Sequence, residues 1–235
     1  NGQKQAVDTG LFADMRTWLF RAISTSFFTS GTNEKLKKIQ NVQKLHGSKD
    51  YYPLSEIIDT DSSLVISDKE ISEYMRIEKK VSFPILNIIY SSTDLISYLE
   101  PAKGYDVDHV HAAKNFLGLD DKRYDTIPNL QLLAYDENRS KNDMSLSDWW
   151  NGKSSTEKDK YLLPTNFSTD ISDFDTFFGD REQMLSEILK KKLGVEEKIK
   201  TIIRKHINNP SGSLAEFIKK CQSSAALEVD GLKDC

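Results

Sequence analysis

Residues 105–150 read YDVDHVHAAKNFLGLDDKRYDTIPNLQLLAYDENRSKNDMSLSDWW, and this stretch decides the predicted fold. Polar residues typical of metal sites stand beside two short apolar segments, 105–110 and 127–133. Both segments favour strands, because short apolar runs with aliphatic residues are typical of half-buried strands. Residues 136–144 favour a helix, with Asp136 as its N-cap. The expected order is strand, loop, strand, helix.

Three side chains in this stretch predict a cation site and a general base. Asp108 and Asn138 both offer oxygen, the ligand atom that Mg²⁺ and Mn²⁺ prefer, and the expected order would bring them to one cation. His109 is the expected general base, because a neutral imidazole near pH 7 can take a proton from water that attacks a phosphodiester. Consecutive residues of a regular strand face opposite sides, so Asp108 and His109 can reach one site only where the strand ends or bulges. We therefore expect irregular backbone at Val110 and His111.

Other polar residues nearby have expected supporting roles. Asn129 is expected to orient the histidine or to tie the loop to the strands. Arg139 and Lys141 follow on the helix, where they could contact substrate phosphates. His111 could contact a phosphate too, or it could take no part in the chemistry. The alternative for the whole set is an aspartate and a histidine that close a structural turn by hydrogen bonds.

These segments resemble the HNH, or His-Me finger, nucleases. The resemblance rests on YDVDH at residues 105–109, NLQLL at 129–133 and ENRSK at 137–141. The pattern is similar to the HNH motif of RNA-guided CRISPR effectors. It is more similar to the C-terminal nuclease domain of GmrSD-type modification-dependent restriction enzymes, a group that includes SspE-like proteins. The position three residues after the histidine is Ala112, where many members carry proline.

The resemblance implies a mainly α-helical chain that carries a small ββα-metal finger. It implies His109 as the general base, Asn129 as a supporting catalytic residue, and Asp108 and Asn138 as ligands of Mg²⁺ or Mn²⁺. The implied activity is endonucleolytic nicking of double-stranded DNA in a bacterial restriction or antiviral defence system. Two alternatives stay open: a catalytically degenerate finger that only binds DNA, and a helical protein-interaction domain.

The chain is expected to comprise three consecutive regions. Residues 1–100 would form a helical region before the nuclease, residues 101–152 the finger, and residues 153–235 a helical region that packs on the finger. The resemblance also implies a sensor or NTPase domain that precedes this chain in the same protein. No glycine-rich phosphate loop occurs in the sequence, so we assign no nucleotide site here.

Apolar spacing adds detail outside the central stretch. Spacings of three and four predict a helix over residues 9–30 whose inward face consists of Leu11, Met15, Trp18, Leu19, Ala22, Ile23 and Phe27. Residues 83–90 form an apolar run that fits either a helix or a buried strand. Trp149 and Trp150 are expected to fasten the end of the finger to the helical body as core residues.

Composition places limits on class and compartment. The chain is 38% hydrophobic and 10% aromatic, which is enough for a packed core. Apolar runs are too short to span a membrane, and the first ten residues lack a secretory signal, so a cytoplasmic protein without membrane contact is expected. The two cysteines, Cys221 and Cys235, show no spacing typical of a zinc site or a disulfide framework.

Charge is the weakest indication of a nucleic-acid partner. The net charge is −4, whereas phosphate contacts require clustered lysine and arginine. Residues 181–206 hold eight Lys or Arg, beginning with Arg181 and Lys190, against four Glu. This excess fits a solvated helix face or a groove that follows a DNA backbone.

Overall fold

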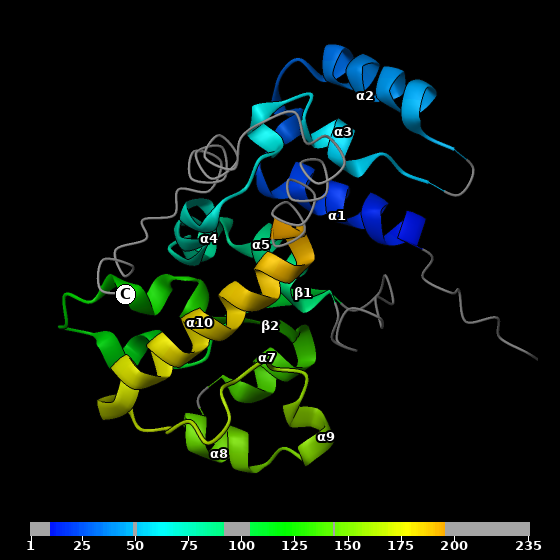
Figure 1. Cartoon of the computed structure of the whole chain (residues 1–235). Coiled ribbons are helices and arrows are strands. Elements are labelled where there is room, and N and C mark those ends of the chain that lie inside the picture. Colours follow the sequence, from blue (N-terminus) through cyan, green and yellow to red (C-terminus); the bar gives the residue numbers. More distant parts are fainter. Residues whose placement is uncertain (1–9, 49–50, 92–103, 143, 196–235) are drawn as a thin grey trace, which may run out of the picture. The chain divides into compact units, whose positions relative to one another are not determined.

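The computed structural model describes residues 10–48, 51–91, 104–142 and 144–195 (Figure 1). Over these residues the chain is mainly helical, as expected, and its sheet has two antiparallel strands. The chain forms two compact units, Asn1–Glu70 with Lys190–Cys235, and Ile71–Leu189. These bounds differ from the three consecutive regions expected, because the first unit combines both ends of the chain. Among the described helices, none has the length and apolar character that crossing a membrane requires.

The first unit is built from short helices around a small apolar core. Its elements are α1 (Gly10–Ser24), η1 (Phe27–Thr29), α2 (Thr32–His46), α3 (Leu54–Ile58) and η2 (Ser62–Leu64). The buried core residues are Ala22, Phe27, Ile39, Tyr52, Ile57, Ile58 and Leu64. Leu11 and Trp18 of α1 pack against this core, because spacings of seven and four residues place them on the face of Ala22.

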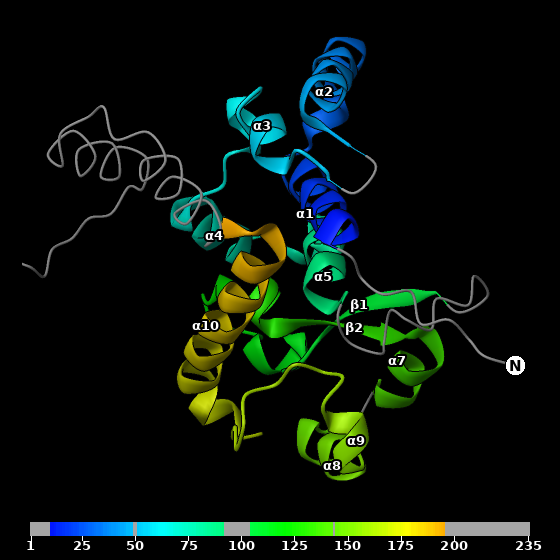
Figure 2. The same cartoon turned by 45° about the vertical axis from the view of Figure 1, so that its right-hand side comes forward.

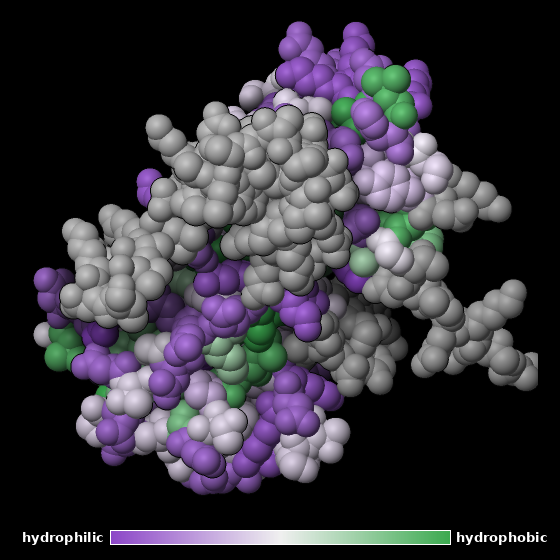
Figure 3. All heavy atoms as spheres, in the orientation of Figure 1, coloured by the Kyte–Doolittle hydropathy of each residue, from purple (hydrophilic) through white to green (hydrophobic). Residues whose placement is uncertain are grey.

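The inward face expected for α1 is only partly correct. Met15, Leu19 and Ile23 are 41%, 45% and 41% exposed, so they form a stripe beside the buried face and not part of it. The helix also ends at Ser24, earlier than the expected range. The face of α2 that is visible in Figure 3 is mainly hydrophilic, with a small hydrophobic patch.

Arg21 fixes α1 to the end of α10 (Phe174–Leu193) within the first unit. Its side chain is 1% exposed, and Nε donates to the carbonyl oxygen of Leu193 at 2.6 Å. The two Nη atoms donate to the carbonyl oxygens of Leu64 at 2.8 Å and Gly194 at 3.0 Å. The last carbonyls of a helix lack partners inside the helix, so a guanidinium at this end satisfies them and complements the helix dipole.

The second unit contains the sheet. Its regular elements are η3 (Lys79–Val81), α5 (Phe83–Tyr90), β1 (Tyr105–His109), β2 (Leu130–Ala134), α7 (Tyr135–Lys141), α8 (Leu146–Asn151) and α9 (Ser155–Lys158). Further 3₁₀ turns are η4 (Ala113–Phe116), η5 (Lys122–Asp125), η6 (Ile127–Asn129) and η7 (Ile171–Asp173). The helix α4 (Asp68–Met75) and α10 continue across the bounds of the unit. The apolar run 83–90 is a helix, and it contacts β2.

The order strand, loop, strand, helix predicted from the sequence is present. β1 pairs with β2 in an antiparallel register that places Asp108 opposite Gln131 and His109 opposite Leu130. β2 begins three residues later than expected, because η6 contains Pro128, which has no N–H to donate to a sheet. α7 follows β2 directly and packs on both strands (Figure 2). The N-cap of α7 is Ala134 and not the expected Asp136.

Aromatic side chains form the core beside the sheet. The buried cluster consists of Val110, Phe116, Leu133, Leu146, Trp149, Tyr161, Phe174, Phe177 and Phe178. Trp149 is 4% exposed, and Trp150 packs against the cluster from a partly buried position. The expectation that this tryptophan pair belongs to the core is therefore confirmed.

Arg181 is a buried part of the fold and not part of a basic surface, which corrects the expectation from the sequence. Its side chain is 0% exposed. The guanidinium donates to the carbonyl oxygens of Leu162 at 3.1 Å and Pro128 at 2.8 Å, and to the hydroxyl of Tyr90 at 3.1 Å. Burial lowers the pKa of Arg181. By binding the Pro128 carbonyl, α10 holds the turn that immediately precedes β2.

Candidate functional site

Asn129 holds the loop between the strands against the end of β1. Its side chain is fully buried, and Oδ1 accepts from the backbone N–H of His111 at 2.9 Å. Nδ2 donates to the carbonyl oxygens of His111 at 3.0 Å and Tyr124 at 2.7 Å. β1 ends at His109, and the chain bends at Val110 and His111 as expected, but only after His109, so Asp108 and His109 still face opposite sides of the strand. These bonds form the expected tie between loop and strands.

His109 is paired with a carboxylate from this loop. Its Nε2 lies 2.9 Å from Oδ1 of Asp125, at the end of η5, and its ring lies 5.9 Å from that of Tyr124. Because a carboxylate oxygen accepts, Nε2 carries the hydrogen in this bond, which leaves Nδ1 with a free lone pair. The His109 side chain is 14% exposed. The pair can therefore hold a neutral imidazole in one tautomer, ready to accept a proton at Nδ1.

The surroundings of His109 favour its neutral form. Burial is the largest cause and lowers the pKa of His109 below its ordinary value, and the charge of Lys79 acts in the same direction. The hydrogen bond with Asp125 and the charges of Asp125 and Asp108 oppose this shift. Since a lowered pKa delays protonation to more acidic pH, the ring stays neutral at pH 7 and becomes charged only as the pH falls through its pKa.

Asp125→Asn is expected to lower the pKa of His109 further. The substitution removes a negative charge that raises this pKa, while the opposing effects of burial and Lys79 remain. The pKa can be measured by NMR titration of the His109 ring protons. Asp120→Asn, at an exposed position in the same loop, is the matched control and should leave the titration unchanged. A raised pKa in Asp125→Asn would contradict this account of the pair.

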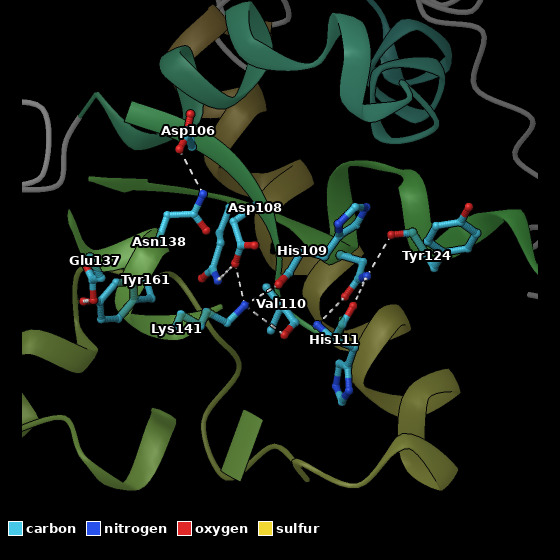
Figure 4. Close-up of polar contacts among 12 residues, drawn as sticks. Asp106, Asp108, His109, Val110, His111, Tyr124, Glu137, Asn138, Lys141 and Tyr161 are labelled. Atoms are coloured by element: carbon cyan, nitrogen blue, oxygen red, sulfur yellow. Dashed lines mark hydrogen bonds and ion pairs between the residues drawn. The ribbon is translucent and has the colours of Figure 1, made fainter. Parts of the chain in front are cut away.

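Asp108 points away from His109 and binds a buried lysine (Figure 4). Its Oδ2 lies 2.5 Å from Nζ of Lys141 and accepts from Nε2 of Gln131 at 3.0 Å. The Lys141 ammonium also donates to the carbonyl oxygens of His109 and Val110. Burial lowers the pKa of Lys141, and Asp108 opposes that shift.

Lys141 therefore occupies a different position from the one expected for a substrate contact. Its side chain is 8% exposed, and its donors bind β1 and the residue after it. The ammonium neutralises Asp108 and joins the end of α7 to the end of β1. In this structure it orders the site from inside and does not reach outward to a phosphate.

Asn138 forms a hydrogen bond with Asp106 and not with Asp108, the residue with which the sequence predicts that it shares a cation. Nδ2 of Asn138 donates to Oδ2 of Asp106 at 2.9 Å (Figure 4). Asp106 and Asp108 are two residues apart in β1, so both side chains lie on the same face of the strand. α7 contributes Asn138 and Lys141 to that face, one to each aspartate.

The oxygen atoms on this face are of the type that hard divalent cations prefer. They come from the carboxylates of Asp106 and Asp108 and the amide of Asn138. Oε1 of Gln131 is a buried acceptor with no hydrogen-bond partner, on a side chain that already contacts Asp108. Within the described parts of the chain, no group of three or more His, Cys, Asp or Glu side chains could hold a metal ion. The donor set here combines two carboxylates with two amides.

Arg139 and His111, the other two predicted substrate contacts, differ in their exposure to solvent. Arg139 is exposed on α7, next to Asn138, and could meet a ligand in solution. His111 is fully buried, with its ring edge-on to Phe174 and Phe177 at centroid distances of 5.6 and 4.6 Å. Burial lowers the pKa of His111 to about 4. His111 is thus a core residue in this structure, and a phosphate has no access to its ring.

Glu137 fixes the opposite side of α7. Its carboxylate accepts from the hydroxyl of Tyr161 and from the ammonium of Lys153. Tyr161 accepts through its own carbonyl oxygen a bond of 2.9 Å from the hydroxyl of Tyr90, which in turn binds Arg181. This chain of bonds connects α7 to α5 and α10 within the second unit, so the helix that carries Asn138 has a defined position.

Sequence reasoning missed Asp125 and the role of Asp106. Asp125 lies sixteen residues from His109, in a 3₁₀ turn for which no periodic signal exists. Asp106 carried a usable signal, because it is two residues from Asp108 in a predicted strand and so shares its face.

No model of a known protein family matches this chain. A comparison with curated protein sequences found no significant match either.

Proposed function

We propose that the unit Ile71–Leu189 is a metal-dependent DNA endonuclease of the HNH, or His-Me finger, type. The observation that carries the proposal is the His109–Asp125 pair at the end of β1, in a strand, loop, strand, helix order whose loop is fixed by Asn129. The resemblance of residues 105–141 to HNH nucleases assigns chemical roles to the residues in this order. A restriction or antiviral defence role, acting on double-stranded DNA, follows from the same resemblance.

In the proposed reaction His109 acts on the attacking water. Nδ1 accepts a proton from water while the oxygen forms a bond to phosphorus, and the bond from phosphorus to the leaving 3′ oxygen breaks. Asp125 holds the Nε2 hydrogen, so it stabilises the imidazolium that forms. The lowered pKa of His109 keeps the acceptor form available at neutral pH.

In this proposal Asp106, Asp108 and Asn138 would hold Mg²⁺ or Mn²⁺, and Asp108 and His109, which face opposite sides of β1 here, would turn toward one phosphate when metal and DNA bind. When bound, such an ion supplies Lewis-acid stabilisation of negative charge on the phosphate and the leaving oxygen. Lys141 keeps one charged partner on Asp108 and fixes the carbonyl groups of His109 and Val110. The lysine thereby couples the position of the acidic face to that of the residue bearing the base.

Asp106→Asn, Asp108→Asn and Asn138→Ala are each expected to weaken Mn²⁺ binding by about tenfold or more, because each removes or weakens an oxygen donor. Isothermal titration calorimetry measures this affinity without reference to cleavage. Asp136→Asn is the matched control, since Asp136 is exposed in the first turn of α7. Normal Mn²⁺ affinity in Asp106→Asn would show that Asp108 and Asn138 suffice, whereas normal affinity in all three variants would place the ion elsewhere.

Incubation of supercoiled plasmid with the protein and Mg²⁺ or Mn²⁺ tests the proposed activity directly. An endonuclease converts supercoiled DNA into nicked or linear forms. A degenerate finger would retard the plasmid in a gel without cutting it, and a protein-interaction domain would do neither. Absence of cleavage over a range of metal concentrations would refute the nuclease proposal.

A further inference from the structure

Lys79, which lies outside the stretch that suggested the site, is placed beside the catalytic pair. Glu78 forms an isolated antiparallel bridge with Thr126, the residue after Asp125. Lys79 and Asp125 are each one residue from a partner of this bridge, so the bridge brings the start of η3 close to the end of η5. Asp125 in turn binds His109 at 2.9 Å. The first residue of η3 therefore lies near the His109–Asp125 pair.

The positive charge of Lys79 acts on groups of the site. It acts on both His109 and Lys141, and it contributes to the lowered pKa of each. Among the residues that the structure describes, no carboxylate forms an ion pair with Lys79. Lys79 is partly exposed, so an anion that arrives from solution can meet its ammonium.

The next residue provides a natural comparison. Lys80 forms an ion pair with Glu78 at 3.5 Å, and its side chain is 78% exposed. Two adjacent lysines thus differ: Lys80 has a local carboxylate partner, whereas Lys79 has none among the described residues and its charge acts on His109.

We propose that Lys79 binds the phosphate group of the phosphodiester that is attacked at His109. This inference rests on the proposed nuclease function and adds to it a cationic contact from η3, outside the ββα segment. Lys141 is committed to Asp108, and Arg181 to backbone carbonyls, so neither fills this role in the structure. An ammonium near the His109–Asp125 pair, without an ion-pair partner among the described residues, can hold the phosphate while Nδ1 of His109 accepts the proton of the attacking water.

The test compares Lys79→Ala with Lys80→Ala in the full chain. Each variant removes one positive charge, so a non-specific charge effect is the same in both. Affinity for a fluorescently labelled DNA duplex is measured by anisotropy, without divalent metal, over a series of salt concentrations. Lys79→Ala should bind about tenfold more weakly, and the slope of log affinity against log salt should decrease by about one. Lys80→Ala should change neither quantity appreciably, and Lys79→Arg should retain most of the affinity.

The outcomes separate this inference from the proposed function. If the wild-type protein cleaves plasmid but the two alanine variants bind DNA equally well, Lys79 is not a phosphate contact and only this inference fails. If the wild-type protein binds DNA without cutting it and Lys79→Ala alone weakens binding, the phosphate contact stands and the nuclease function fails. If the wild-type protein neither binds nor cuts DNA, both are overturned. Circular dichroism of each variant verifies that the fold is retained.

Discussion

Replacing His109 with alanine is expected to reduce metal-dependent DNA cleavage by about 10²–10⁴-fold, the usual contribution of a general base. The substitution removes the only group at the end of β1 whose free lone pair, at Nδ1, is proposed to accept the proton of water. The fold should persist, because the His109 carbonyl that binds Lys141 belongs to the backbone and remains. Asp125 is 34% exposed, so water can replace the lost ring as its partner.

The measurement is the rate of plasmid nicking at saturating Mg²⁺, together with the DNA affinity of the same variant. His46→Ala is a suitable control, since His46 is exposed at the end of α2 and belongs to the other unit. A loss of cleavage with normal affinity supports the assignment. Nicking by His109→Ala at the wild-type rate would remove His109 from the mechanism.

The order of the central elements could be predicted from the sequence because the signals are local. Short apolar runs and a polar stretch with acids before basic residues are sufficient to place a strand, a loop, a strand and a helix. The apolar run alone does not predict where β2 begins, because Pro128 has no N–H to donate and so delays the start of the strand. The pairing of Asn138 with Asp106 depends on how far α7 lies along β1. A shift of two residues along a strand keeps the same face, so alternation alone does not distinguish Asp106 from Asp108.

The hydrogen-bond partners of buried polar side chains could not be predicted from local sequence patterns. Arg21 and Arg181 are satisfied by carbonyl oxygens that distant segments supply, and Lys141 by both a carboxylate and carbonyls. Charged residues are normally exposed, so composition predicts the opposite surroundings for all three. His111 is similar, because only the tertiary structure shows that two phenylalanines of α10 enclose its ring. Contacts between residues far apart in sequence determine these environments, and one sequence does not encode them in a periodic pattern.

Asn129→Ala is expected to lower the free energy of unfolding by about 3 kcal/mol, because it leaves three buried or partly buried backbone groups without their partner at about 1 kcal/mol or more each. These groups are the N–H and carbonyl of His111 and the carbonyl of Tyr124. The first pair lies just beyond His109, and Tyr124 immediately precedes Asp125. Loss of the amide should therefore also misplace both His109 and Asp125.

Urea unfolding measures the stability of Asn129→Ala, and plasmid nicking at low temperature measures its activity while the variant is folded. Asn129→Asp separates shape from hydrogen bonding, since a carboxylate of the same size keeps the acceptor for the His111 N–H but offers no donor to the two carbonyls. Asn115→Ala is the matched control, because Asn115 is exposed in η4 of the same loop and should be neutral within about 0.5 kcal/mol. We expect Asn129→Asp to lose both stability and cleavage, because repulsion between its carboxylate and the two carbonyls opens the loop. If Asn129→Asp matched the wild-type protein in both measurements, the two donated bonds would contribute nothing, and the position of the His109–Asp125 pair would have to depend on the packing of Tyr124 and Phe116, whose rings stack at 5.3 Å.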